Sequence, residues 1–185
     1  MNKFEIVSKY IGDDSKVIND IKLPVRATKG SAGYDFFVIE DILIPSYSQR
    51  MEELSNYVAK RAPYSLQDIK NVTKETKIRP TLIPTGIKCH LDEGYYLELS
   101  IRSSIPLHSW LILANGEGII DSDYYNNIDN EGEIFFQLIN LAPIDVYLRK
   151  GDRVGQGIIK KYELVDEDIF TSEERNGGFG STTNE

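Results

Sequence analysis

The stretch Asn115-Gly116-Glu117-Gly118-Ile119-Ile120-Asp121-Ser122-Asp123-Tyr124 combines two glycines, a β-branched pair, two carboxylates and an aromatic ring. Apolar residues on both sides, at Trp110–Ala114 and Ile134–Ile139, predict buried strands that hold this segment as a rigid loop. Because glycine has no side chain, such a loop can bring backbone N–H and C=O groups close to a base or a sugar. The stretch also offers a carboxylate, at Asp121 or Asp123, that can act as a general base. The alternative interpretation is a hairpin turn in which Gly and Asp serve the turn alone.

Short strand patterns recur along the rest of the chain, separated by turns that contain Gly, Pro or Asp. Such regularly spaced strands indicate an all-β domain of the sandwich or jelly-roll type. A glycine-bearing bend leads into one strand, and Asp35 lies at the entrance to it. That strand follows the bend within Thr28–Phe37, and Ile42–Pro45 ends the strand region. The other predicted strands are Lys3–Val7, Thr81–Lys88, Ile87–Leu91, Tyr95–Ile101, Glu133–Asn140, Val146–Leu148 and Gly157–Tyr162.

A helical insert interrupts this strand-rich chain between Ser46 and Arg79. The first part is rich in helix formers with apolar residues on one face, and we expect Ser48 to cap that helix. Ser65 and Asp68 resemble a capping box and predict a second, weaker helix. The insert is either an added surface hairpin or a module that binds a partner protein.

Composition sets limits on the class of protein. The 185 residues suit one domain, with 41% hydrophobic and 27% charged residues. The net charge of −8 argues against a general affinity for nucleic acid or for an anionic membrane. If the ligand is itself an anion, local cations or a metal must reverse the field at the site.

Cysteine and histidine are scarce. The single cysteine, Cys89, excludes an intrachain disulfide and is interpreted as a small apolar residue in a strand. His90 and His108 have no zinc-ligand spacing. Because no apolar run reaches the length of a membrane span and the N-terminus lacks a signal-like apolar region, we expect a soluble, cytoplasmic protein.

The C-terminal residues 165–185 differ from the domain at 1–164. They begin acidic and change to Arg175-Asn176-Gly177-Gly178-Phe179-Gly180-Ser181-Thr182-Thr183. By composition this is a flexible end. Alternatively it is a lid that becomes ordered on binding, because Gly, Ser and Thr amides with an arginine can surround phosphates and an aromatic ring can stack on a base.

Five segments, taken in order, resemble the motifs of the trimeric deoxyuridine triphosphatase (dUTPase) family. They span most of the chain, and the central and final segments are the most specific. They are Ala32-Gly33-Tyr34-Asp35, Arg102-Ser103-Ser104, Asn115 through Tyr124, Gly151-Asp152-Arg153-Val154-Gly155-Gln156, and Arg175 through Thr182.

The resemblance implies a fold and an activity. The family folds as a jelly-roll-like β-barrel and assembles as a homotrimer. Its members hydrolyse dUTP to dUMP and pyrophosphate with Mg²⁺, which keeps uracil out of DNA and supplies dUMP. Each site is shared by three subunits and is closed by a C-terminal lid. A phage or prophage origin fits the extra insert, and the location would then be the host cytoplasm.

Resemblance also implies roles for residues of the central stretch. Asp121 corresponds to the general base that deprotonates the attacking water. Tyr124 corresponds to the ring that packs against deoxyribose, where a ribose 2′-OH would collide. Asn115, Gly118 and Ile120 belong to a hairpin that reads uracil and is too narrow for the methyl group of thymine.

The remaining motifs correspond to phosphate contacts and their supports. Arg102, Ser103, Ser104 and Gln156 match the phosphate-binding positions. Mg²⁺ would be held mainly through the substrate phosphates, without a direct protein ligand. The supporting residues are Asp35, with a water-mediated contact to the metal, and Arg153, which bonds to Asp35. In the lid, Phe179 matches the ring over uracil, and Arg175, Gly180, Ser181 and Thr182 match the phosphate clamp.

The chain departs from the family pattern at two points near the site. Ser104 stands where glycine is usual, and the glycine that usually follows Tyr124 is absent. Two alternative functions stay open. One is a dCTP deaminase or bifunctional deaminase–dUTPase, although Gln137 stands where that family has its catalytic glutamate. The other is a dUTPase-like regulator that senses nucleotide and binds a partner protein.

Overall fold

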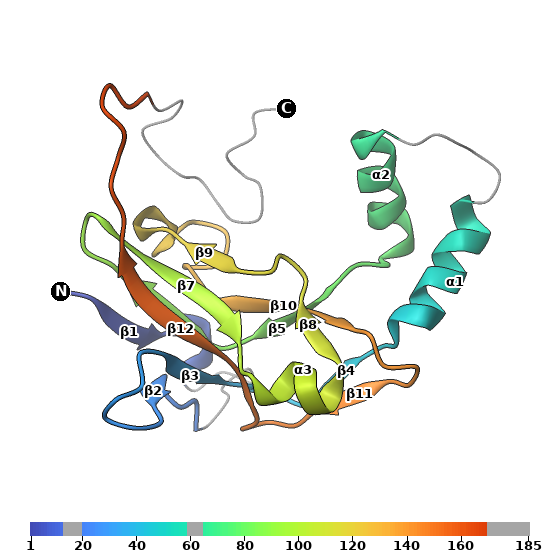
Figure 1. Cartoon of the computed structure of the whole chain (residues 1–185), viewed down its shortest axis with the longest axis horizontal. Coiled ribbons are helices and arrows are strands. Elements are labelled where there is room, and N and C mark those ends of the chain that lie inside the picture. Colours follow the sequence, from blue (N-terminus) through green and yellow to red (C-terminus); the bar gives the residue numbers. More distant parts are fainter. Residues whose placement is uncertain (13–19, 59–64, 170–185) are drawn as a thin grey trace.

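The computed structural model describes residues 1–12, 20–58 and 65–169 (Figure 1). Strands dominate it, as the sequence predicts. The largest sheet has five strands in the order β2-β3-β12-β7-β9, and a three-stranded sheet has the order β5-β10-β8. The pairs β1-β6 and β11-β4 complete the set. The bounds are β1 Lys3–Ile6, β2 Val25–Arg26, β3 Tyr34–Phe37, β4 Ile42–Ile44, β5 Thr81–Pro84, β6 Ile87–His90, β7 Tyr95–Ile101, β8 Leu111–Leu113, β9 Gly118–Ile120, β10 Phe135–Asn140, β11 Val146–Leu148 and β12 Arg153–Lys161.

The hydrophobic core lies between these sheets. In β10, Phe136 and Leu138 are buried while their neighbours are half-buried, which is the period of two that one covered face requires. Phe36 of β3 meets Phe136 edge to face, with ring centroids 5.6 Å apart. Leu97 and Leu99 of β7 are buried in the same cluster. The core therefore joins the five-stranded sheet to the three-stranded sheet and fixes their edges relative to each other.

Two helices form the predicted insert, α1 (Tyr47–Val58) and α2 (Leu66–Thr76), and they stand beside the sheets at one end of the molecule (Figure 1). The capping box of α2 is confirmed, because the Asp68 N–H donates to the Ser65 hydroxyl and the Asp68 carboxylate accepts the Ser65 N–H. The predicted cap of α1 is wrong. That helix begins at Tyr47, so Ser48 lies in its first turn.

Two features near the central loop differ from expectation. A short helix, α3 (Ser104–Ser109), follows β7 and was not predicted, because a six-residue turn gives little periodic signal. The turn at 115–117 is also not part of a simple hairpin. Its flanking strands pair elsewhere, β8 with β10 and β9 with β7. The central loop therefore crosses from one sheet to the other. Two 3₁₀ turns complete the elements, η1 (Ser8–Tyr10) and η2 (Ser122–Tyr124).

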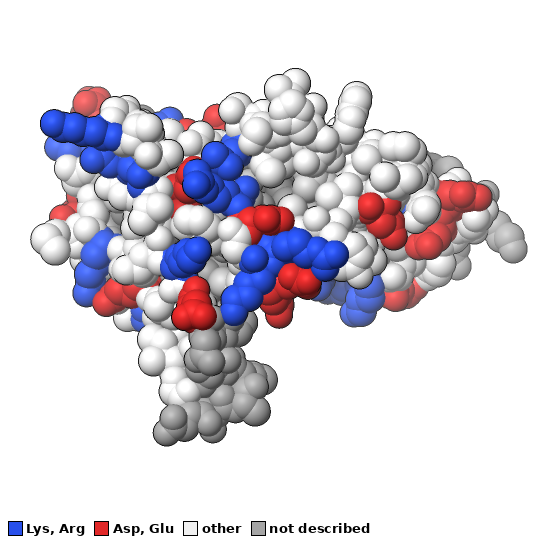
Figure 2. All heavy atoms as spheres, turned by 90° about the horizontal axis from the view of Figure 1, so that it is seen from below, with Lys and Arg blue, Asp and Glu red and all other residues white. Residues whose placement is uncertain are grey.

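Charges of both signs are interspersed over the face shown in Figure 2, where Lys and Arg side chains alternate with Asp and Glu. Salt bridges pair opposite charges among the described residues, for example Arg149 with Asp41 at 2.8 Å and Lys160 with Glu98 at 2.6 Å. Among the described residues, no helix is long and apolar enough to cross a membrane.

Candidate active site

A buried carboxylate in the five-stranded sheet brings together two arginines, one at the start of β12 and one directly after β7. Asp35 of β3 is only 5% exposed. Its two oxygens face Arg102 Nε at 3.3 Å and Arg153 Nη1 at 3.2 Å. A buried charge needs such partners, because burial of an isolated carboxylate is costly. Both guanidinium groups remain partly exposed, so Asp35 holds two cations at the surface where an anion can reach them.

Gln156 lies next to this cluster. In the ladder between β12 and β3 it stands opposite Asp35, and its Nε2 donates to Ser100 Oγ at 3.3 Å. Gly33 makes room for it, since a Cβ at that position would lie 2.6 Å from Gln156 Oε1. The glycine of the first motif thus permits the close approach of the fourth motif. Three of the five motifs meet at this point of the fold.

The Arg102-Ser103-Ser104 segment turns from β7 into α3. The Ile105 N–H donates to the Arg102 carbonyl at 2.9 Å and closes the turn. Ser103 and Ser104 are both exposed, so their hydroxyl groups face solvent beside the arginine cluster. Ser104, which replaces the usual glycine, is the first residue of α3.

The central loop occupies the far edge of the same sheet. Asn115 is exposed in the turn before β9, and Gly118 packs against Leu99 so closely that a Cβ would lie 3.1 Å from the Leu99 Cβ. Ile120 stands opposite Leu97 in the ladder with β7. β9 therefore lies tightly against β7, with its backbone fixed by the ladder.

Asp121 directly follows β9 and precedes η2. It is half-buried, and its carbonyl accepts the Tyr124 N–H at 3.2 Å. Tyr124 is 6% exposed, and its hydroxyl donates to the Glu133 carbonyl at 2.9 Å. The carboxylate and the ring therefore belong to one rigid turn.

The ladder register separates this turn from the arginine cluster. Because Leu97 pairs with Ile120, Asp121 lies near the start of β7, whereas Arg102 follows its end. Five residues from Leu97 to Arg102 correspond to about 17 Å of strand. Asp121 and Arg102 thus lie beyond opposite ends of the β7–β9 ladder within one chain, whereas Gly118, opposite Leu99, lies at the end nearer to Arg102.

Comparison with known proteins places these groups in a family. The family model for dUTPase matches residues 52–183. The chain belongs to the dUTPase family. A curated deoxyuridine 5′-triphosphate nucleotidohydrolase from Lactococcus lactis is 36% identical over 97% of this chain and 95% of its own length. The predicted family and the prediction of an enzyme are confirmed.

Solved structures support the same assignment. A crystal structure of dUTPase from Streptococcus mutans matches with a TM-score of 0.63 and 33% identity, covering 88% of this chain and 98% of that one. A mutant dUTPase from phage phi11 of S. aureus matches with a TM-score of 0.57 over 94% of this chain and 97% of that one, at 16% identity, and is described as coordinating a structural Mg(II) ion. The predicted all-β fold of the dUTPase family is therefore confirmed.

A glycine packs against the backbone of Tyr124 from the end of the loop that follows it. Residues 125–131 form a loop that returns the chain to Tyr124, and Gly132 then lies against it with φ of +80°. A Cβ on Gly132 would lie 2.7 Å from the Tyr124 carbonyl oxygen. Sequence reasoning missed this loop. Its signal was Asn-Asn followed by Asn-Glu-Gly, a turn composition directly after Tyr124.

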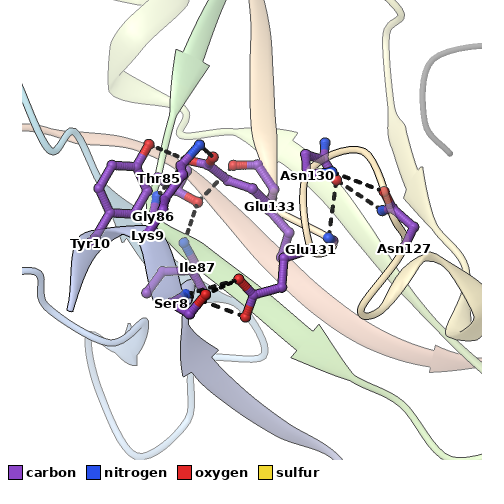
Figure 3. Close-up of polar contacts among 12 residues, drawn as sticks. Ser8, Lys9, Tyr10, Thr85, Gly86, Ile87, Asn127, Asn130, Glu131 and Glu133 are labelled. Carbon is purple, nitrogen blue, oxygen red and sulfur yellow. Dashed lines mark hydrogen bonds and ion pairs between the residues drawn. The ribbon is translucent and has the colours of Figure 1, made fainter. Parts of the chain in front are cut away.

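Two acidic residues tie this loop to the N-terminal segment (Figure 3). Glu133 is fully buried and accepts from Lys9 Nζ at 2.5 Å, from Tyr10 Oη at 2.9 Å and from the Gly86 N–H at 3.2 Å. Burial, followed by the charge of Glu133, raises the pKa of the Tyr10 phenol. Tyr10 therefore stays neutral and donates to Glu133.

Glu131 makes the second connection. It accepts from the Ser8 N–H and hydroxyl and from Lys88 Nζ. Burial alone would raise the pKa of Glu131, but the bonds from Lys88 and Ser8 outweigh burial and lower it. Lys88 also donates to Asn126 Oδ1 at 2.8 Å. The loop is therefore fixed to η1 and β6 by charge-assisted hydrogen bonds.

The side chains of the described residues limit how a metal ion could bind. Among the described residues, no group of three or more His, Cys, Asp or Glu side chains could hold a metal ion. Asp35 faces a guanidinium at each oxygen.

Cys89 is 1% exposed, and burial raises the pKa of its thiol to about 12. Its interpretation as a small apolar residue is thereby confirmed.

The predicted lid residues Arg175, Phe179, Gly180, Ser181 and Thr182 lie outside the described residues, which end at residue 169.

Proposed function

We propose that this chain hydrolyses dUTP to dUMP and pyrophosphate, with Asp121 as the general base. The observation that carries the proposal is the Asp35 cluster, which presents Arg102 and Arg153 at the surface on the sheet that also carries the Asp121–Tyr124 turn. The net charge of −8 makes such a local concentration of cations necessary for a triphosphate ligand. The resemblance of five ordered motifs to the family supports each assignment.

In the proposed reaction Asp121 accepts a proton from a water molecule while the oxygen of that water attacks the α-phosphorus. The bond from that phosphorus to the bridging oxygen breaks, and the leaving pyrophosphate takes the electron pair. Arg102, Ser103 and Gln156 hold the phosphate oxygens in line with the attack. Positioning and neutralisation of charge supply most of the rate enhancement in such reactions.

Selectivity for dUTP is assigned to the central loop. Backbone groups between Gly118 and Ile120 would read the edge of uracil, and the tight packing of Gly118 on Leu99 supports a slot of fixed width. Tyr124 would lie against deoxyribose, where its buried ring leaves no room for a 2′-OH. The lid at 165–185 would close over the base and phosphates and exclude water.

Assembly as a homotrimer completes the proposed site. The positions of Asp121 and Arg102 at opposite ends of the β7–β9 ladder support a site to which different subunits contribute these residues. A shared site between neighbouring subunits fits this arrangement, as the family resemblance implies.

Magnesium fits this site when it is carried by the substrate. Mg²⁺ prefers phosphate oxygens and keeps several waters, so it needs few protein ligands. Asp35 is a buried carboxylate that pairs with Arg102, one of the proposed phosphate contacts, and a metal-bound water would be a suitable further partner for it. The ion would supply neutralisation of the triphosphate charge and alignment of the phosphates. The residues of this chain position the phosphates and accept the proton.

The test is pyrophosphate release from dUTP, dCTP, dTTP and UTP, each with and without Mg²⁺. We expect turnover of dUTP alone, dependent on Mg²⁺. Deamination or turnover of dCTP would favour the deaminase alternative. The half-buried amide of Gln137, opposite Leu82 in the β10–β5 ladder, argues against that alternative because an amide cannot serve as a base.

A second role, as a regulator that binds a partner protein, has one supporting observation. Among its described residues α1 has no buried side chain, and Tyr57 and Leu66 are exposed although they are large and apolar. This role is compatible with catalysis. Tight dUTP binding without turnover would favour the regulator over the enzyme.

A further inference from the structure

The loop that follows Tyr124 holds this residue at both ends. At the backbone, Asn127 Nδ2 donates to the Tyr124 carbonyl at 2.9 Å. At the far end of the side chain, Asn130 Nδ2 donates to Tyr124 Oη at 2.7 Å. The same hydroxyl donates to the Glu133 carbonyl. The Tyr124 phenol is therefore both acceptor and donor in a buried chain of hydrogen bonds.

Asn130 is itself fixed in place. Its Oδ1 accepts from Asn127 Nδ2 at 2.8 Å and from the Gly132 N–H at 3.0 Å (Figure 3). Its backbone N–H donates to Asn127 Oδ1 at 3.2 Å. These bonds orient the amide so that its NH₂ group points at Tyr124. A side chain constrained in this way loses little further freedom when it holds a partner.

The body of the protein anchors the loop next to Asn130. Glu131 bonds to Ser8 and Lys88, and Glu133 bonds to Lys9, Tyr10 and Gly86. These bonds fix the loop, and with it the Tyr124 ring, relative to η1 and β6, which are distant in sequence. A loop anchored at two carboxylates can transmit a fixed position to the ring, which a free loop could not do.

We infer that Asn130 is a positioning residue that fixes the Tyr124 ring through its hydroxyl and thereby sets the discrimination between deoxyribonucleotides and ribonucleotides. This inference rests on the proposed function of Tyr124 as the sugar-facing ring. Exclusion of a hydroxyl by contact requires a ring that cannot retreat. The hydrogen bonds of the Tyr124 hydroxyl with Asn130 and with the Glu133 carbonyl fix the orientation of the ring, because a tilt of the ring would break both bonds at once.

The test compares kcat/KM for dUTP and UTP in the wild type, Asn130→Ala, Tyr124→Phe and the double variant. We expect Asn130→Ala to lower the dUTP-to-UTP ratio about tenfold, the effect of one buried hydrogen bond that no longer biases the ring. Tyr124→Phe keeps the ring and loses the hydroxyl, so it should lower the ratio similarly. When Asn130→Ala is added to Tyr124→Phe, it should have little further effect on the ratio, because both changes act through one bond.

Asn140→Ala is the matched control. Asn140 is also buried and makes three amide bonds, to Ile44, Ile144 and Ala142, but it lies in β10 away from Tyr124. It should lose stability and keep the wild-type ratio. If Asn130→Ala does not fold, Asn130→Asp decides, since it keeps the oxygen that accepts from Asn127 and Gly132 and removes the NH₂ group that donates to the Tyr124 hydroxyl.

An unchanged ratio in folded Asn130→Ala, or full additivity in the double variant, would overturn the inference. A loss of ratio in Asn140→Ala as large as in Asn130→Ala would also overturn it, because the effect would then follow stability. The same discrimination is measured as the Kd of dUMP against UMP by calorimetry. A wild-type protein that binds dUMP selectively but does not turn over dUTP would refute the proposed function and leave this test intact.

Discussion

Complementation between two inactive variants tests whether the two ends of the β7–β9 ladder serve one substrate. Asp121→Asn removes the proposed base at one end, and Arg102→Ala removes a proposed phosphate-binding cation at the other. Arg153 still pairs with Asp35 in the second variant, so we expect the cluster to stay folded. Each variant alone should lose at least about a hundredfold in kcat, the usual cost of removing one preorganised catalytic group.

The magnitude of the recovery follows from the register. A separation of about 17 Å along the strand prevents Asp121 and Arg102 of one chain from meeting at one phosphate. If neighbouring subunits share each site, random assembly of an equal mixture gives about a quarter of the sites both intact residues, since each contributing subunit is suitable half of the time. The mixture should therefore recover about a quarter of wild-type activity.

The assay is pyrophosphate release after the two variants are unfolded together, reassembled and checked for equal folded content. Mixing Asp121→Asn with Tyr124→Ala is the matched control, because both lesions fall in the same turn and one subunit supplies both residues. That mixture should show no activity beyond what the Tyr124→Ala subunits contribute by themselves. Absence of recovery with Arg102→Ala, from correctly reassembled protein, would refute the argument from the register.

The remaining predictions concern the base, the loop and the insert. Asp121→Asn should lower kcat about a thousandfold and leave the Kd of a non-hydrolysable dUTP analogue nearly unchanged; retained turnover would remove Asp121 as the base. Glu131→Gln should destabilise the protein by about 1 kcal/mol at pH 7. Burial raises the Glu131 pKa, but the bonds from Lys88 and Ser8 outweigh burial and lower the pKa from 4.5. The stabilisation by the Glu131 carboxylate is therefore present above pH 4.5 and is lost as the pH falls through the pKa of the folded state. Urea unfolding of the two proteins should converge in acid; a constant difference would contradict this linkage. Replacing residues 48–78 by a short Gly-Ser linker, with the buried Ser46 retained, should leave a folded and active assembly by size-exclusion chromatography and pyrophosphate release. A misfolded or dissociated product would place the insert in the core or the interface.

Local signals predicted most of the elements. Strand periodicity located β7 and β11 at their observed bounds, and the Ser65–Asp68 capping box located the start of α2. These features depend on residues a few positions apart, so the sequence contains them directly. The start of α1 and the short helix α3 were missed, because single-turn features leave weak patterns and helix ends vary by a residue or two.

Sequence alone determined the family and the identity of the candidate site residues, because the five motifs are recognised from residue types and their order along the chain. Only the tertiary structure decided how these residues combine. The pairing of Asp35 with Arg102 and Arg153, the opposite ends of the β7–β9 ladder and the hold of Asn130 on Tyr124 all depend on strand register and on packing. Register is set by long-range contacts and by the burial of whole faces, and a shift of one residue would turn each side chain to the other face.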